Sequence, residues 1–211
     1  MFAASSSLLR RRGAPAPVTQ IELFFDLIFV FAVTQISEFL RTHLNSLGAF
    51  QGLMLFAAMW WCWVYTSWVT NWIDPERRPV KLLLLGLMGC ALLLAASLPE
   101  AFAERGLAFA IGLGGLNLGR SMFMLWALRR HDSGNYRNFQ RISIWLGIGA
   151  GLWLLGGLAE GSARMALWIA ALLIDLSGPV NGFYVPASAV RRRRTGRSMP
   201  GTWPSAAPAS C

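Results

Sequence analysis

Six long apolar stretches, separated by short polar connections, dominate this sequence. They cover residues 21–40, 47–72, 80–98, 106–128, 142–159 and 165–185 of the 211-residue chain. A hydrocarbon core about 30 Å thick is crossed by about twenty helical residues, and each stretch is close to that length. Residues 81–98 and 142–158 are continuous runs of Leu, Gly, Ala and Ile rather than the alternating strands of a membrane barrel. The sequence therefore predicts an all-α, polytopic membrane bundle of six transmembrane helices.

Composition excludes the main alternative classes. Hydrophobic residues make up 55% of the chain and charged residues only 14%, whereas soluble domains carry about 25% charged residues. Cys62, Cys90 and Cys211 provide neither a disulfide framework nor the ligand spacing of a metal site, and they fit the role of small apolar fillers. His43 and His131 fall in opposite loops. We therefore expect no bound metal and no cofactor.

The basic residues are distributed unevenly among the connections. Fifteen of the nineteen Lys and Arg residues lie near the two ends of the chain or at the connections between the second and third and between the fourth and fifth stretches. The other connections contain one arginine each, Arg41, Arg105 and Arg164, and Arg120 lies inside the fourth stretch. Because Lys and Arg accumulate on the cytoplasmic side, both termini are predicted to be cytoplasmic, in a bacterial inner membrane. The net charge of +9 then indicates a lipid bilayer as partner, and no nucleic acid.

Both ends of the chain differ from its middle. Residues 1–18 contain an arginine cluster with no apolar region before Ala14-Pro15-Ala16-Pro17, so we expect a disordered basic leader instead of a cleaved signal peptide. Residues 187–211 are rich in Arg, Pro, Ser and Ala, which is typical of a disordered tail. The predicted membrane domain covers residues 19–186.

Several polar residues lie inside the predicted spans, where a charge costs about 2.5 to 3.5 kcal/mol. The candidate intramembrane polar site comprises Glu22, Asp26, Asn117, Arg120 and Asp175. One interpretation is that these residues meet in the bundle interior and bind an ion, a proton or a substrate, so that Asp26→Asn abolishes transport. The other is a structural ion pair of Arg120 with Asp26 or Asp175. The sequence leaves both open.

The second and later stretches contain two further patterns. Trp61, Tyr65, Trp68 and Trp72 form one helical stripe, which indicates an interfacial belt or packing, or else a surface that binds a cation over the rings. Small residues at four-residue spacing predict close helix contacts within a bundle or a dimer; they are Gly115 and Gly119, Gly147 and Gly151, and Gly178 and Gly182. No zinc-protease, nucleophile-elbow or phosphate-loop motif is present, so we expect no catalytic residue and no enzyme.

Two segments resemble a known family. The two segments are ELFFDLIFVFAVTQ at residues 22–35 and WVTNWIDPER at residues 68–77. They are similar to the bacterial low temperature requirement A (LtrA) family. The similarity continues at Gly119-Arg120, at RNF in residues 137–139 and at DLSGP in residues 175–179. The resemblance implies a multi-pass membrane protein of undefined biochemical activity, named for a growth defect in the cold. It also implies motif positions at Glu22, Asp26, Asn71, Asp74, Glu76, Arg77, Arg120 and Asp175.

Among those positions, Asn71, Asp74, Glu76 and Arg77 lie at the predicted cytoplasmic end of the second stretch. They form a candidate cytoplasmic motif, either a structural cap or loop ion pair, or a gate. Members of the family are usually nearly twice as long, with further spans, so the chain is expected to represent the N-terminal half, truncated or frameshifted after about residue 186. A homo-oligomer or a second half-bundle would then complete the path.

These observations predict a transporter-like or channel-like protein that moves an ion or small solute. Two alternatives remain open at this stage. One is a non-transporting membrane scaffold or sensor for low-temperature growth, and the other is an inactive truncated copy.

Overall fold

The computed structural model describes residues 20–71, 73, 74, 76–129 and 133–183, with the side chains of 133–135 excepted. The predicted leader and tail lie outside these residues. The elements in chain order are α1 (Gln20–Thr42), α2 (Ser46–Thr70), α3 (Arg78–Ser97), the short 3-10 helix η1 (Leu98–Glu100), α4 (Gly106–Leu128), α5 (Ser133–Leu158) and α6 (Gly161–Val180). Within these ranges, six helices are long and apolar enough to cross a membrane. The predicted all-α, six-span architecture is confirmed.

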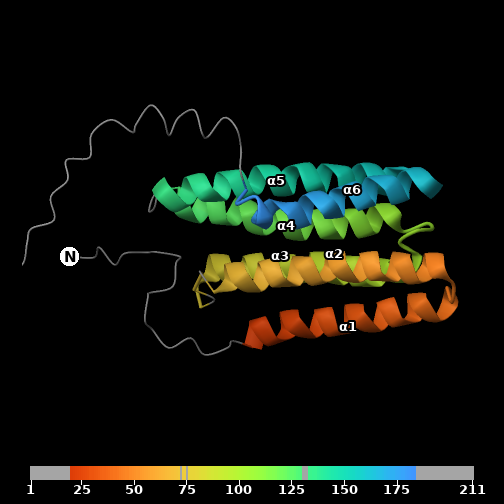
Figure 1. Cartoon of the computed structure of the whole chain (residues 1–211). Helices are drawn as coiled ribbons and strands as arrows, with labels where there is room; N and C mark the ends of the chain where they lie inside the picture. Colours follow the sequence, from red (N-terminus) through yellow and green to blue (C-terminus); the bar gives the residue numbers. More distant parts are fainter. Residues whose placement is uncertain (1–19, 72, 75, 130–132, 184–211) are drawn as a thin grey trace, which may run out of the picture.

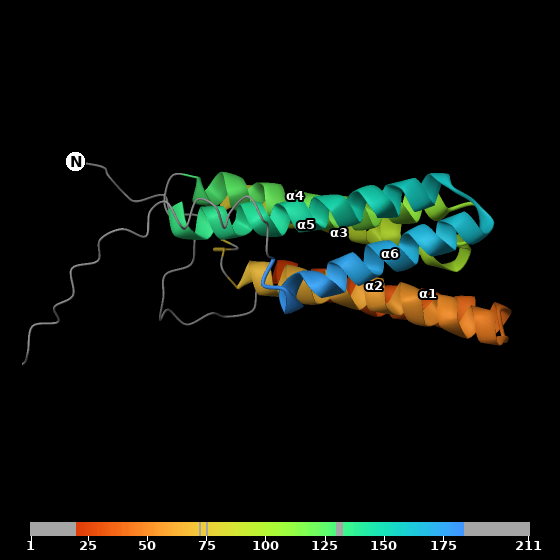
Figure 2. The same cartoon turned by 45° about the horizontal axis from the view of Figure 1, so that its top comes forward.

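The helices lie side by side with their long axes roughly parallel, and successive helices run in opposite directions (Figures 1 and 2). α3 packs between α1 and α4, and α5 packs between α4 and α6. α2 contacts α1, α4 and α6. Because α2 touches helices from both parts of the chain, its side chains connect the N-terminal helices to α4 and α6.

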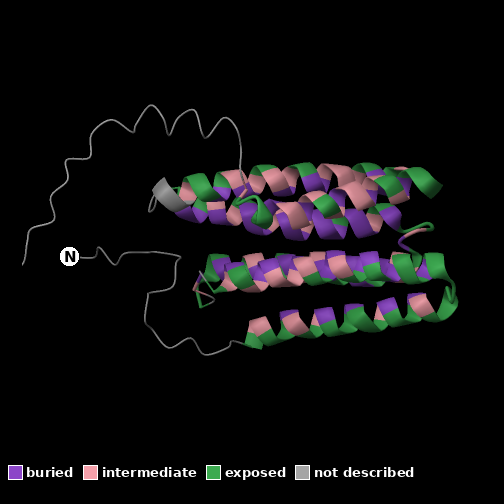
Figure 3. Ribbon diagram, in the orientation of Figure 1, coloured by how far each residue is buried: buried purple, intermediate pink, exposed green. Residues whose placement is uncertain are grey.

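The outward surface of the bundle is apolar. In α1, the buried positions Phe25, Phe29 and Ala32 follow helical spacing, whereas the large apolar residues Leu27, Val30 and Phe31 between them are exposed. Figure 3 shows exposed residues along the outer side of α1 and buried residues on the helix faces within the bundle. Such an extended apolar surface suits the hydrocarbon of a bilayer, which solvates it without the penalty that water imposes.

Three helix boundaries differ from the predicted ones by more than two residues, namely the start of α5 and both ends of α6, which begins at Gly161 instead of residue 165. α5 begins at Ser133, well before the predicted residue 142, because Phe139 and Ile142 are buried against α2 and hold a polar first part of the helix in place. α6 ends at Val180 instead of residue 185. Gly182 and Phe183 adopt positive φ angles of 56° and 51°, and their N–H groups bond to the carbonyl oxygens of Pro179 and Gly178, which terminates the helix.

Glycines permit close contact between α3 and α4. A Cβ atom built on Gly112 would lie 2.8 Å from the Leu94 nitrogen and 2.9 Å from the Cys90 oxygen, so the two backbones nearly touch. Gly115 and Gly119 also face α3, as their spacing predicts. In contrast, a Cβ on Gly147 or Gly151 of α5 would meet nothing within 4 Å in the described part of the chain.

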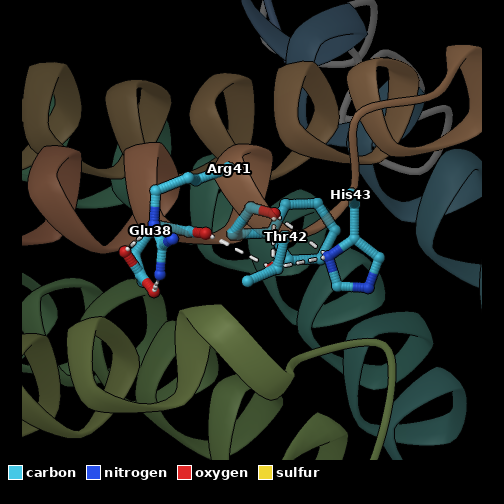
Figure 4. Close-up of polar contacts among 5 residues, drawn as sticks. Glu38, Arg41, Thr42 and His43 are labelled. Atoms are coloured by element: carbon cyan, nitrogen blue, oxygen red, sulfur yellow. Dashed lines mark hydrogen bonds and ion pairs between the residues drawn. The ribbon is translucent and has the colours of Figure 1, made fainter.

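The far end of α1 is held by local polar contacts (Figure 4). Arg41 forms an exposed ion pair with Glu38 at 2.6 Å. The His43 ring stacks on Phe39 at 4.4 Å between ring centroids, and its Nδ1 lies 3.0 Å from the Thr42 hydroxyl. These groups are exposed or partly buried at the helix end, as expected where a helix leaves the hydrocarbon region.

Candidate functional site

A buried arginine lies in the middle of the bundle. Arg120 of α4 is only 1% exposed, and its guanidinium group crosses the interface to α2. Its Nη1 donates to the Cys62 carbonyl oxygen at 2.9 Å and to the Thr66 hydroxyl at 2.8 Å. Its Nη2 donates to Oδ1 of Asn117, one turn earlier on α4. Among the described residues, the hydrogen-bond acceptors of Arg120 are therefore all neutral groups.

The α2 side of this contact is arranged around one helical turn. The Thr66 hydroxyl donates to the Cys62 carbonyl at 2.8 Å while it accepts from Arg120. The Tyr65 ring lies beneath the guanidinium, with the Arg120 Cζ atom 4.9 Å from the ring centroid. A cation over an aromatic face is stabilised by the ring quadrupole, by more when water is excluded. The aromatic stripe of α2 thus binds a cation, and that cation belongs to the protein itself.

Asp175 of α6 is the second buried charged residue in this region, at 6% exposure. Its Oδ2 accepts a hydrogen bond from the Trp153 indole at 2.9 Å. Gly149 of α5 leaves room for the carboxylate, because a Cβ atom there would collide with Asp175 Oδ1. That Oδ1 atom is buried and has no hydrogen-bond partner within the described structure. The carboxylate is therefore only half satisfied.

Arg120 and Asp175 face the same interior without touching. No ion pair joins them among the described residues. The Nε atom of Arg120 is likewise buried and has no hydrogen-bond partner among the described residues. The described residues therefore contain no direct ion pair of Arg120 with Asp26 or Asp175. Each of the two charges instead retains one unpartnered polar atom.

The carboxylates of α1 lie elsewhere. Asp26 is half-buried, and its Oδ1 accepts a hydrogen bond from the Trp63 indole of α2 at 2.8 Å. Glu22, on the same helix, is also half-buried and is not without an interaction partner. Among the described residues, Asp26 forms no hydrogen bond or ion pair with Arg120 or Asp175. The structure thus brings Asn117, Arg120 and Asp175 to the interior and leaves Glu22 and Asp26 at the α1–α2 edge.

The motif after α2 forms a compact loop. Asn71 is exposed at the C-terminal end of α2. Asp74 accepts a hydrogen bond from the Glu76 N–H at 3.1 Å and pairs with Arg77 at 3.4 Å. Glu76 pairs with Lys81 at 3.1 Å. The loop ion pairs that the sequence allowed are therefore present in the structure. Exposed pairs of this kind contribute about 0 to 1 kcal/mol each to stability.

The rest of the aromatic stripe packs against the later helices. Trp61 and Tyr65 lie 5.5 Å apart between ring centroids, and Trp68 stacks on Phe139 of α5 at 6.1 Å. Phe183, just beyond α6, meets the edge of Tyr65 at 6.2 Å. Trp72 lies outside the described residues. The stripe therefore serves helix packing around the arginine.

Sequence reasoning missed a second buried arginine, Arg164, which was assigned to a loop. It is 5% exposed near the start of α6, and it donates to the carbonyl oxygens of Ala159, Ala101 and Ala103 at 2.9, 3.1 and 2.6 Å. Gly106 makes room, because a Cβ there would lie 2.6 Å from the Arg164 Cζ atom. The sequence did offer one signal: Arg164 lies four residues before Trp168, so the two side chains share one face of a helix, and Trp168 is buried in the structure.

The arrangement offers binding chemistry. A guanidinium in a low-dielectric interior attracts anions, and a half-satisfied carboxylate accepts a proton or a cation. No three His, Cys, Asp or Glu residues gather as a metal site within the described ranges. A buried guanidinium and a buried carboxylate can interact electrostatically with small charged species.

Comparison with known proteins supports the resemblance found in the sequence. The family described as bacterial low temperature requirement A protein (LtrA) matches residues 17–204, which extends past residue 186. An uncharacterised protein of Rhizobium meliloti (strain 1021) is 41% identical over 174 residues, covering 82% of this chain and 42% of the relative. The chain thus spans less than half the length of that relative. No solved structure matches.

Proposed function

This chain belongs to the bacterial LtrA family of multi-span membrane proteins, and we propose that it forms part of a transporter-like or channel-like bundle. In this proposal, protons or small ions pass through a polar centre composed of Asn117, Arg120 and Asp175. Asp26 and Glu22 provide a second polar position at the α1–α2 edge. The proposal assigns the chain no catalytic reaction.

One observation carries this proposal. Arg120 and Asp175 are both buried inside the bundle, and each holds an unpartnered polar atom within the described structure. Burying charges without direct pairing costs several kcal/mol of folding free energy. Ionisable residues at membrane depth that face the bundle interior typically mark an ion or proton pathway. A scaffold would gain more from replacing these residues with apolar ones.

The bundle is proposed to reside in the bacterial inner membrane with both termini in the cytoplasm. The excess of Lys and Arg at one end of the bundle supports this orientation. The match to less than half of a longer relative supports a transport path completed by a second half-bundle or a second copy of this chain. Transporters are often built from two such repeats.

The test is proton flux into liposomes that contain the purified full chain and a pH-sensitive dye. We expect flux above that of empty liposomes, and a decrease of at least tenfold for Asp175→Asn, because the amide cannot accept a proton. Asp26→Asn should reduce the flux less, since Asp26 is half-exposed and bonded to Trp63.

The matched control is Glu38→Gln, which removes an exposed carboxylate of α1 and should leave the flux unchanged. A folded Asp175→Asn variant with wild-type flux would refute the assignment. A chain that shows no flux at all, but loses thermal stability on Asp175→Asn, would instead support the scaffold or sensor interpretation, in which Arg120 only links α4 to α2.

A further inference from the structure

Three residues fold back at the end of α6. We call residues 181–183 the α6 turn, and they lie at the end of the bundle where α2 also ends and α5 begins (Figures 1 and 2). The Phe183 N–H donates to the Gly178 carbonyl oxygen at 2.8 Å. The Phe183 ring lies over Gly178, because a Cβ atom on that glycine would be 2.7 Å from the ring. Gly178 therefore makes room for the ring that follows it.

The backbone of the α6 turn has a conformation that a phenylalanine rarely adopts. Phe183 has a φ angle of 51°, in the left-handed region, where a Cβ atom crowds the following carbonyl oxygen. Arg141 of α5 offsets this cost. Its Nε donates to the Phe183 carbonyl oxygen and its Nη2 to that of Gly182, both at 2.9 Å. Because bonds from a charged donor are stronger than neutral ones, the turn depends on Arg141 to keep its shape.

A proline lies just before the α6 turn. Pro179 is part of the last turn of α6 and has no N–H group, so it cannot donate the usual helical hydrogen bond to the Asp175 carbonyl oxygen. Helices bend most easily where such a bond is missing. The end of α6 can therefore swing while the preceding turns of the helix stay folded.

The Phe183 ring covers the residues that surround the buried arginine. Its edge meets the Tyr65 ring of α2 at 6.2 Å between ring centroids, and the Arg120 Cζ atom lies 4.9 Å from the centroid of the same tyrosine ring. The Nη1 atom of Arg120 is in turn 3.7 Å from the Cys62 Sγ atom. Cys62 is only 1% exposed. Phe183, Tyr65 and Arg120 thus form one continuous series of contacts from the end of the bundle to Cys62.

Phe183 is the outermost member of this series. It is half-buried, whereas the Tyr65 ring beneath it is buried, and it follows the end of α6, so its movement separates no pair of helices. We propose that the α6 turn is a latch that closes the surroundings of Arg120 at this end of the bundle. When Arg141 releases the two carbonyl oxygens, the Phe183 ring leaves Tyr65 and water reaches the guanidinium. Carriers open a polar centre to one side at a time. This inference rests on the proposed transport function and names the element that regulates access to its site.

The experiment measures the access of water to Cys62 and needs no transport. The full chain carries Cys90→Ala and Cys211→Ser, which leaves Cys62 as its single thiol. The purified protein in detergent is treated with sulfonatoethyl methanethiosulfonate, a charged reagent that modifies thiols in contact with water, and intact mass is followed over time. We expect slow modification of this parent chain. Phe183→Ala, which removes the ring, and Arg141→Met, which frees the turn, should each raise the rate at least tenfold.

Two controls separate a latch from general loosening of the bundle. Arg129→Met removes an exposed arginine at the same end and should leave the rate unchanged. Arg164→Met removes buried contacts at the opposite end and should lower thermal stability without faster modification. If Phe183→Ala does not fold, Phe183→Gly suits the positive φ angle, lacks the ring and should also react at least tenfold faster. Rapid modification of the parent chain, slow modification of folded Phe183→Gly and Arg141→Met, or equal acceleration by Arg164→Met would each overturn the inference.

The two proposals fail in different ways. Flux that depends on Asp175, together with a Cys62 thiol that stays protected in every latch variant, would retain the transport function and reject the latch. Faster modification of Cys62 in the latch variants, but no flux in liposomes, would retain the latch as a conformational element and reject transport.

Discussion

Replacing Arg164 with methionine is expected to lower the free energy of unfolding by about 3 to 5 kcal/mol, because hydrogen bonds to charged groups contribute about 1.5 to 3 kcal/mol each. Three carbonyl oxygens, from the end of α5 and from the turn after η1, lose their donor. At least the Ala101 carbonyl belongs to a buried residue. The measurement is the midpoint of unfolding when SDS is titrated into detergent-solubilised protein.

The control for this substitution is Arg105→Met. Arg105 lies at the same end of the bundle, pairs with Glu100 at 2.7 Å and is half-exposed. A surface ion pair of this kind contributes about 0 to 1 kcal/mol, so its loss should shift the midpoint only slightly. Equal shifts for the two variants would show that the buried contacts of Arg164 do not stabilise the bundle.

The second large effect is expected for Gly112→Ala, with a loss of about 3 kcal/mol. The new methyl group would lie within 3 Å of the α3 backbone at Cys90 and Leu94. Backbone atoms within a helix cannot rotate away, so α3 and α4 must separate, and overpacking of this kind costs about 1 to 3 kcal/mol or more. The same SDS titration gives the measurement.

Gly89→Ala on α3 is the matched variant. A Cβ atom there would meet nothing within 4 Å among the described residues, and alanine favours a helix over glycine by up to about 1 kcal/mol. We therefore expect stability that is unchanged or slightly higher. If Gly112→Ala is tolerated equally well, the close approach of α3 and α4 is not required for the fold.

The sequence was sufficient for the class of protein and for most helix boundaries. α4 spans Gly106–Leu128, as its apolar stretch predicts, because crossing a bilayer requires only length and hydrophobicity. The start of α5 was missed because its first residues are polar. Their helical form depends on Phe139 packing against Trp68 of α2, a contact between residues far apart in the chain.

The candidate site was only partly predictable. Arg120 and Asp175 stood out because charges within apolar stretches are costly. Their partners did not, since Thr66, Trp153 and Gly149 are ordinary residues until the helices are packed. Arg164 was counted with a loop because it is close to the end of an apolar stretch.

Hydrophobicity adds up along the chain, so the order of residues alone determined that this protein folds in a membrane as six helices. It did not determine which side of each helix faces inward, because helices such as α2 and α4 are apolar over most of their circumference. Only packing fixes the rotation of one helix against the next. That rotation placed Arg120 against α2, turned Asp175 toward Trp153, and left Asp26 at the α1–α2 edge.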